Sequence, residues 1–331
     1  MILVTGGTGL VGSHLLNRLI NDGKKVRALY RAENSKTIVK DIFAHYNTQG
    51  FDSIEWIEGD LMDYFLLRDA MKDVNTVYHC AAMVSFKPSD RGAMFHINVE
   101  GTANLVNAAI ECQIARFCHV SSIATLGKSQ NGELIDETSF WQIDDNHSVY
   151  SQSKFRAEME VWRGTKEGLK AVVVNPSVII GPCHPDKSSG QLISALSKNM
   201  TFYTDGGTGF VDVRNVIDAM VELAQSDALN ERFIVNGENL RYKELMQTAA
   251  DVFSVKAPNI KANRLLTGIA WRLERLKYML WGKEPKMTKE TARTSQNQSR
   301  YSSAKLNDVV PMRVYSVKEA LENVASFELG S

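Results

Sequence analysis

The sequence predicts an α/β protein with a doubly wound parallel sheet and a smaller, mostly helical substrate lobe. Residues 2–4 form an apolar run typical of a buried strand, and a glycine-rich turn follows at residues 6–12. Apolar residues then recur at helical spacing from Leu15 to Ile20. Segments typical of strands and helices alternate in this way as far as residue 182, as in a parallel sheet with crossover helices.

The glycine-rich turn predicts a nucleotide site. Gly6, Gly9 and Gly12 are spaced G-x-x-G-x-x-G between the first strand and the first helix. Gly6 permits the tight turn, Gly9 lets backbone N–H groups approach a pyrophosphate, and Gly12 lets the helix pack against the strand. The helix N-terminus adds unpaired donors and the positive end of a dipole. This context indicates a Rossmann-type dinucleotide-binding fold. The residues of this loop expected to bind the cofactor are Gly6, Thr8, Gly9, Leu10, Val11 and Gly12.

The composition excludes several classes of protein. Of 331 residues, 44% are hydrophobic and 23% charged, and the net charge is zero, so no basic excess favours nucleic acid as a partner. No apolar run approaches the ~20 residues of a membrane span, and we expect no signal peptide, because a strand is predicted to begin at residue 2. The four cysteines form no C-x-x-C pair and fit buried thiols in a reducing compartment. We expect a cytoplasmic enzyme that binds a small-molecule substrate, without a metal site or membrane contact, and compatible with a homodimer.

The end of the second predicted strand, at residues 25–30, bears on the choice of cofactor. Folds that prefer NAD place an acidic residue there to bind the ribose 2′-hydroxyl. This chain has Tyr30-Arg31 instead, and a guanidinium suits a 2′-phosphate because it can make two parallel charge-assisted hydrogen bonds. Lys36 is a further cation nearby. Arg31 could instead be a solvated loop residue, but we favour NADP(H) over NAD(H).

Loops after the next two predicted strands supply further expected contacts. Asp60 and Leu61 follow the third strand, where Asp60 either accepts a hydrogen bond from the adenine amino group or caps the next helix. The small residues Ala81 and Ala82 follow the fourth strand and leave room for a cofactor across the sheet edge. Apolar side chains in the same loop either line a substrate pocket or pack within the loop, namely Met83, Val84 and Phe86.

The remaining pattern divides the chain into a nucleotide-binding domain and a substrate lobe. Further strands are expected at 54–58, 76–79, 117–121, 171–174 and 232–235, and helices at 36–46, 98–112, 150–162 and 213–225. Beyond residue 182 the alternation loosens, and from residue 236 the chain has a helical pattern. We assign residues 1–182 and 207–236 to the nucleotide-binding domain and residues 183–206 and 237–331 to the lobe. The polar run 288–303 is expected to be an exposed connection.

Three residues carry the expected chemistry. Tyr150 and Lys154 are four apart on a predicted helix and therefore project from one face. A tyrosine has an ordinary pKa of about 10, which a neighbouring ammonium lowers by favouring the phenolate. Lys154 could also hold the nicotinamide ribose. Ser122 follows the fifth predicted strand and would hydrogen-bond the substrate oxygen.

In sequence the chain resembles the extended short-chain dehydrogenases/reductases, also called the NAD-dependent epimerase/dehydratase family. The matching motifs are TGGTGLVG at 5–12, GDL at 59–61, HCAA at 79–82, VSSIATLG at 120–127, YSQSK at 150–154 and NPSVIIGP at 175–182. The resemblance implies that Ser122, Tyr150 and Lys154 are catalytic, that Pro176 and Val178 help to bind the cofactor, and that hydride transfer uses the pro-S face. It also matches Asn98 to a family asparagine, which we interpret as mainly structural.

Two departures from the family pattern bear on the substrate. Nucleotide-sugar members usually have asparagine where this chain has Val178, and tyrosine where it has Leu126. The chain is more similar to the dihydroflavonol-reductase and hydroxysteroid-dehydrogenase branch. The resemblance therefore implies an NADP-dependent oxidoreductase acting on a ketone, an aldehyde or the corresponding alcohol, with Tyr150 as proton donor. The alternatives are a nucleotide-sugar epimerase or dehydratase, and a catalytically silent NADP-binding protein.

Residues 263–282 form an amphipathic segment with one apolar and one basic face. We favour a lobe helix packed on the core. The alternatives are a lid over an apolar substrate, which would share a pocket with Met83, Val84 and Phe86, and a helix that rests on an anionic membrane.

Overall fold

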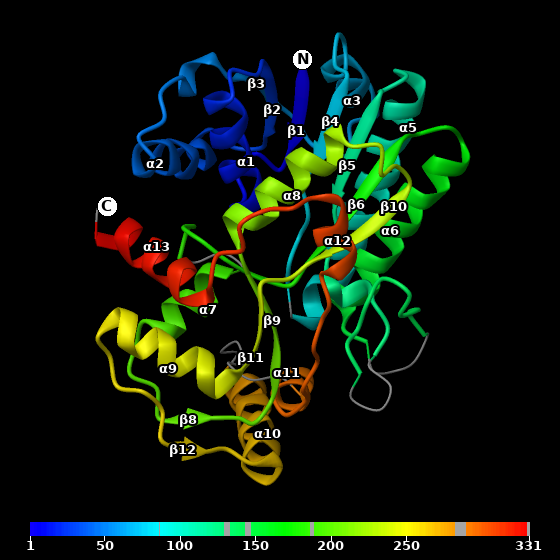
Figure 1. Cartoon of the computed structure of the whole chain (residues 1–331). Helices are drawn as coiled ribbons and strands as arrows, with labels where there is room; N and C mark the ends of the chain where they lie inside the picture. The colour runs from blue at the N-terminus through cyan, green and yellow to red at the C-terminus, as the bar shows by residue number, and fades with distance from the viewer. Residues whose placement is uncertain (86, 129–132, 143–146, 186–188, 282–288, 330–331) are drawn as a thin grey trace.

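Seven parallel strands form one central sheet in the computed structural model, which describes residues 1–85, 87–128, 133–142, 147–185, 189–281 and 289–329 (Figure 1). Across the sheet the strands are β3 (Glu55–Glu58), β2 (Val26–Tyr30), β1 (Ile2–Thr5), β4 (Thr76–His79), β5 (Arg116–Val120), β6 (Ala171–Pro176) and β10 (Glu231–Val235). Every neighbouring pair is parallel. The order reverses between β1 and β4, and such a switch point opens a crevice at the carboxyl ends of the two strands.

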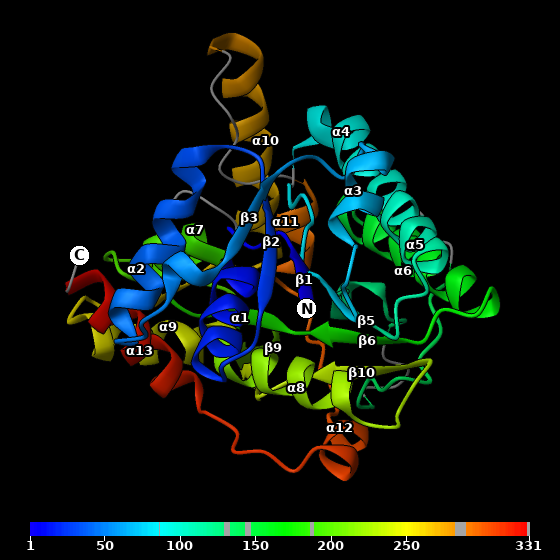
Figure 2. The ribbon, with the colours of Figure 1, turned by 90° about the horizontal axis from the view of Figure 1, so that it is seen from above.

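Helices cover both faces of this sheet (Figure 2). One face carries α1 (Leu10–Asn21), α2 (Thr37–His45) and α8 (Val213–Gln225), and the other carries α3 (Tyr64–Ala70), α5 (Gly101–Glu111) and α6 (Val149–Lys166). Consecutive strand residues point to opposite faces. Val4 accordingly packs in the core with Leu15 and Leu16 of α1, whereas Leu3 packs in the opposite core with Leu105 of α5.

Short helical turns connect these elements. They are η1 (Glu33–Lys36), η2 (Phe51–Ser53), η3 (Pro88–Asp90), α4 (Arg91–Phe95), the π-helical η4 (His96–Glu100) and η5 (Ile123–Thr125). The helix expected at 98–112 is thus a π-helical turn that continues into α5.

A second, smaller core lies beyond the main sheet. It is built on a three-stranded sheet of β7 (Val178–Ile180), β9 (Gly207–Asp212) and β11 (Glu238–Arg241). Around it lie α7 (Ser189–Leu196), α9 (Tyr242–Phe253) and α13 (Val317–Leu329), which bury Ile193, Phe210, Leu245 and Leu321 together. The remaining elements are β8 (Phe202–Tyr203), β12 (Ile260–Lys261), α10 (Arg264–Trp281), α11 (Lys289–Thr294) and α12 (Ala304–Val309).

The doubly wound parallel sheet confirms the expected fold class, and its strands lie within two residues of the expected ranges. The strands of the smaller core were not predicted. Residues 207–212 pair with β7 and β11, whereas α8 and β10 pack with the main sheet. Conversely, Leu306 of α12 packs in the main core.

Two expectations for the C-terminal third are wrong. The run 288–303 is not simply an exposed connection, because α11 buries Ala292 and residue Tyr301 forms a parallel bridge with Ile135. The packing expected for 263–282 is also wrong over the described residues of α10. Its apolar side chains, among them Leu265 and Leu273, face solvent.

Candidate active site

The glycine turn after β1 lies against the loop after β4, at the switch point of the sheet. Gly6 has a φ of +67°, a conformation that favours glycine. A Cβ at Gly6 would lie 2.5 Å from the Ala81 nitrogen, and one at Gly12 would lie 2.1 Å from the Gly6 carbonyl oxygen. Only glycine therefore permits this approach of loop, helix and strand. The result is a shallow backbone cradle that ends at the half-exposed start of α1.

This cradle fits a pyrophosphate. Gly9 precedes the first residue of α1 and has no side chain to cap the helix. The N–H groups of Leu10, Val11 and Gly12 belong to the first turn, which lacks intrahelical acceptors. Such N–H groups, together with the helix dipole, bind anionic phosphate oxygens. Thr8 is half-buried and Gly9 is exposed, so the loop is accessible from outside.

The residues at the ends of β2 and β3 are accessible as well. Arg31 follows β2 and is exposed. The Lys36 ammonium is less available to a ligand than expected, because it pairs with Glu33 at 2.8 Å and lies 3.8 Å from the centre of the Tyr30 ring. Of the two cations expected near a 2′-phosphate, Arg31 is thus the more available.

Asp60 does not cap the following helix. Its carboxylate accepts a hydrogen bond from the Met62 N–H at 3.0 Å, whereas Asp63 is the N-cap of α3 and accepts from the Leu66 N–H at 3.0 Å. The capping alternative is therefore wrong for Asp60, which remains exposed. Leu61 beside it is buried against Gly101 of α5.

Ser122 lies in the turn that follows β5. Its hydroxyl oxygen accepts a hydrogen bond from the Ala124 N–H at 3.1 Å and so caps the short η5 turn. Its carbonyl oxygen accepts from the side chain of Asn175, on β6, at 3.2 Å. The side chain is half-buried at the carboxyl edge of the sheet.

The structure brings the side chains of Ser122 and Tyr150 close together. Tyr150 lies in the first turn of α6, whose start is capped by Ser148 and is tied to the η5 turn by a hydrogen bond from Ser151 to the Ala124 carbonyl. Lys154 is one turn further along α6, 2% exposed, and its ammonium donates to the Val120 carbonyl at 2.7 Å. The three predicted catalytic residues therefore gather at one point.

Burial is the main influence on the pKa values of Tyr150 and Lys154. Burial raises the pKa of the Tyr150 phenol, and the hydrogen bond with Ser122 opposes that rise only in part. This direction is opposite to the lowering expected from Lys154, because the loss of hydration is the largest influence on the phenol. Burial also lowers the pKa of Lys154 to about 8, while the nearby Glu158 carboxylate acts to raise it. Near neutral pH the site thus holds a protonated phenol beside a cationic ammonium.

The buried carboxylate of Glu158 connects the elements that carry Ser122, Tyr150 and Lys154. Glu158 is 0% exposed and accepts hydrogen bonds from Ser121 and Thr125, which flank the Ser122 turn, at 2.5 and 2.8 Å. Its other donors are Asn175 at 3.0 Å and the Trp162 indole at 3.2 Å, and Arg232 of β10 forms an ion pair with it at 3.5 Å. The Glu158 carboxylate thus connects α6 to the residue that follows β5, to β6 and to β10, next to the candidate site.

Glu158 and its donors were not predicted. A signal was nonetheless present in the sequence, because Tyr150, Lys154 and Glu158 recur every four residues and so share one helix face. A glutamate on a helix is usually solvated, however, and most partners that bury this one lie far away in the sequence, in the turn after β5, on β6 and on β10.

The expected substrate loop is fixed at one point. The side chain of Asn98, buried in the π-helical η4, accepts from the Met83 N–H at 2.7 Å and donates to the Met83 carbonyl at 2.9 Å. The same amide donates to Ser153, next to Lys154, at 3.0 Å. Asn98 therefore has the structural role expected of it. Met83 is half-buried and Val84 is 40% exposed, while Phe86 lies outside the described residues.

Pro176 and Val178 lie at the junction of the two cores. Pro176 ends β6 and is buried, and Val178 begins β7 and packs at the edge of the smaller core. All four cysteines are free, but only Cys118 is fully buried, whereas the other three are half-buried. Burial raises the pKa of Cys80, after β4, to about 12, which keeps this thiol protonated.

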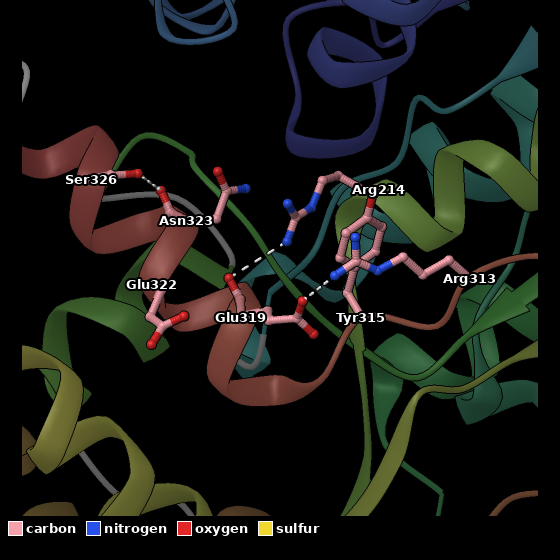
Figure 3. A pocket seen from close by; sticks show the side chains of 7 residues that line it. All are labelled: Arg214, Arg313, Tyr315, Glu319, Glu322, Asn323 and Ser326. Carbon is pink, nitrogen blue, oxygen red and sulfur yellow. Dashed lines mark hydrogen bonds and ion pairs between the residues drawn. The ribbon is translucent and has the colours of Figure 1, made fainter.

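A separate polar cavity of about 440 Å³ lies between α8, residues 313–315 and α13 (Figure 3). Its two cations are paired: Arg214 with Asp212, a buried residue outside the lining, at 2.6 Å, and Arg313 with Glu319 of the lining at 2.5 Å. Both guanidinium groups also stack on Tyr315, at 3.8 and 4.6 Å from the ring centre. None of the predicted site residues lines this cavity, whose contacts instead hold α13 against the main sheet.

Replacement of Glu158 by alanine is expected to lower the free energy of unfolding by about 3–5 kcal/mol, because it leaves Arg232 and several buried donors without their shared acceptor. The matched control is Glu160→Ala, two residues further along α6, which removes only the partly exposed ion pair with Arg163 and should cost no more than about 1 kcal/mol. Urea denaturation of both variants measures the difference. Equal midpoints would show that the buried carboxylate does not support the fold.

Comparisons with known proteins identify the family of the chain. The family model of the NAD dependent epimerase/dehydratase family matches residues 2–236. A putative dihydroflavonol 4-reductase of Synechocystis sp. is 30% identical over 325 residues, which cover 96% of this chain and 91% of that protein. Sterol demethylase protein B of Methylococcus capsulatus is 28% identical, covering 81% of this chain and 79% of that protein.

Solved structures show the same fold. The crystal structure of gox2253 has a TM-score of 0.83 and 29% identity, and the match covers 100% of this chain and 98% of that one. UDP-glucose 4-epimerase of Thermotoga maritima, solved with UDP-glucose, has a TM-score of 0.78 at 18% identity, covering 99% and 98% of the two chains. The latter likeness concerns the fold alone. On the matched residues and the near-complete coverage of its relatives, the chain belongs to the NAD dependent epimerase/dehydratase family.

Proposed function

We propose that this protein is an NADP(H)-dependent oxidoreductase that reduces a ketone or aldehyde of a small, fairly apolar molecule, or oxidises the corresponding alcohol. One observation carries the proposal: the side chains of Ser122 and Tyr150 lie close together, one helical turn from the buried Lys154, at the strand ends next to the glycine cradle. The names of several relatives support a carbonyl substrate, among them the putative dihydroflavonol 4-reductase and cinnamoyl-CoA reductase 1 of Petunia hybrida, which is 26% identical over 76% of this chain.

The residues present fit a dinucleotide. The glycine cradle and the first turn of α1 would hold the pyrophosphate, Arg31 would face the 2′-phosphate, and Lys154 would face the nicotinamide ribose. The remaining contacts would come from Asp60, Leu61, Ala81, Ala82, Pro176 and Val178. When bound, the nicotinamide supplies the hydride for reduction or accepts it in oxidation.

Side chains of the protein itself would bind the carbonyl oxygen of the substrate and supply its proton. The hydroxyls of Ser122 and Tyr150 would both hydrogen-bond the carbonyl oxygen and stabilise the negative charge that develops on it. Tyr150 would then donate its proton to that oxygen, a role that suits a phenol whose raised pKa keeps it protonated. The Lys154 ammonium would stabilise the phenolate that remains.

For cofactor choice, we predict that NADPH binds more tightly than NADH and that Arg31→Ala removes most of this preference, on the order of 1–3 kcal/mol for charge-assisted hydrogen bonds. Lys36→Ala is the matched control and should have a smaller effect, because Lys36 is already paired with Glu33. Calorimetric titration of both cofactors measures the preference. Equal affinities in the unmodified protein would refute an NADP(H) site.

For catalysis, we predict that Tyr150→Phe lowers turnover of aromatic and alicyclic ketones by at least about 10²–10⁴-fold, the usual contribution of a general acid, while NADPH affinity changes little. Lys154→Ala should damage both turnover and binding. Loss of NADPH absorbance in the presence of ketone reports the rate. Tyr64→Phe, which removes only a hydrogen bond to Glu111 on the surface, serves as the control.

Near-normal turnover by the Tyr150→Phe variant would disprove the proton-donor role. If the unmodified protein oxidised NADPH with none of these carbonyl compounds, and instead interconverted UDP-sugars, the epimerase alternative would hold. Cofactor binding without either reaction would favour the silent NADP-binding alternative.

The pH dependence follows from Lys154. Because its pKa is about 8, kcat/KM for ketone reduction should fall about tenfold per pH unit above pH 8, as the active cationic form is lost. The carboxylate of Glu158 raises this pKa, so Glu158→Gln should move the decline to lower pH. A pH–rate profile of both proteins is the measurement. A flat profile between pH 7 and 10 would exclude a required ammonium.

A further inference from the structure

The described part of α10 turns its apolar side chains away from the molecule. Five leucine and isoleucine side chains on this helix are 45–71% exposed: Leu265, Leu266, Ile269, Leu273 and Leu276. In Figure 2, α10 extends outward beyond the neighbouring elements of the lobe. A soluble surface rarely leaves so many large apolar residues together without a binding role.

These five side chains form one narrow stripe. At 3.6 residues per turn, their positions span an arc of about 100° around the helix. Thr267, about 150° from the middle of that arc, is 3% exposed and lies 3.5 Å from the Gln296 amide, on the side where α10 meets the lobe. The helix is therefore attached to the protein by the side that carries Thr267, and the apolar stripe on the other side is exposed to solvent.

Basic residues border the stripe on both sides. Arg272 and Lys277 lie about 20° beyond its two edges, and Arg264 and Arg275 lie further round on the Arg272 side. Residues 261–278 contain five basic residues and one acidic residue, although the chain as a whole is neutral. The acidic residue, Glu274, is paired with Lys277 at 2.9 Å, and Lys261 is paired with Asp205.

The charges beside the stripe favour an anionic surface over a second copy of the protein as its binding partner. A second copy of α10 packed on it would bring Arg272 and Arg275 close to their own counterparts, which is unfavourable between like charges. An anionic surface instead attracts the basic rows while its apolar interior takes the leucines. Among the described residues, no helix has the length and apolar character needed to cross a bilayer, so the contact would be parallel to the surface.

We propose that α10 is a peripheral membrane helix, whose stripe of Leu265, Leu266, Ile269, Leu273 and Leu276 enters the interface of an anionic phospholipid bilayer. Arg272, Arg275 and Lys277 contact the phosphate groups at the same depth. The sequence predicts no membrane contact. The proposal departs from that prediction because the apolar face of α10 is exposed to solvent. It is independent of the reaction that the enzyme catalyses.

Co-sedimentation of the full-length protein with vesicles tests the proposal. Vesicles of phosphatidylcholine alone are compared with vesicles of phosphatidylcholine and phosphatidylglycerol, at physiological and at several-fold higher salt. We expect pelleting with the anionic vesicles only, weakened by salt, which screens exposed charges. The double variant Arg272→Glu/Arg275→Glu should lower the partition coefficient by about tenfold or more, since each basic residue contributes roughly 1 kcal/mol of attraction.

Two further variants complete the test. Ile269→Ser/Leu273→Ser keeps the charges and should also lose vesicle binding, because it removes the middle of the stripe. Lys24→Glu/Lys25→Glu reverses two exposed charges at the turn between α1 and β2, and should bind vesicles as the unmodified protein does. Circular dichroism and thermal unfolding check that each variant is folded.

Three results would overturn the proposal. The first is equal pelleting of the unmodified protein and the two α10 variants. The second is an absence of vesicle binding together with a dimer that Ile269→Ser/Leu273→Ser dissociates, which would assign the stripe to a second copy. The third is an absence of vesicle binding together with a raised KM in the same variant, which would identify α10 as a lid over the substrate.

Discussion

The carboxylate of Glu158 connects the elements that carry the candidate catalytic side chains. It receives hydrogen bonds from both sides of the Ser122 turn and from Asn175, and it faces Arg232 on the edge strand β10. A charge with no exposure is stable only when such partners surround it. The same hydrogen bonds also fix the position of α6 on the sheet, and therefore the place where Tyr150 and Lys154 meet Ser122. Burial of this network also explains why the site combines a protonated phenol with a lysine of lowered pKa.

The glycine cradle imposes a second constraint on the same edge of the sheet. The turn after β1 can approach the loop after β4 only where no Cβ intervenes, and this approach occurs where the strand order reverses. The cradle and the Ser122–Tyr150–Lys154 group therefore open at the same edge because all seven strands are parallel. Asn98 adds a link from the Met83 loop to α6, which holds the start of the expected substrate loop beside the candidate catalytic group.

The main sheet and the positions of the three candidate catalytic residues could be predicted because local patterns determine them. Apolar runs, glycine spacing and the four-residue interval of Tyr150 and Lys154 are all visible within a few residues. The strands of the smaller core could not, because β7, β9 and β11 are short and pair residues as distant as Val178, Phe210 and Glu238. The cap of α3 was assigned to Asp60 as one alternative, although Asp63 directly precedes the helix. For α10 the periodicity identified an apolar face, but periodicity alone does not determine whether that face points inward or outward.

The central claim is that Ser122, Tyr150 and Lys154 make this family member a carbonyl reductase. Isotope transfer tests that claim most directly. The protein is incubated with a ketone and with NADPH deuterated at the pro-S position of C4, and the alcohol is analysed by mass spectrometry. The account predicts one deuterium on the carbinol carbon. Turnover of a UDP-sugar without net oxidation of NADPH, and without formation of an alcohol from the ketone, would contradict it. An alcohol that contains no deuterium would contradict transfer from the pro-S face.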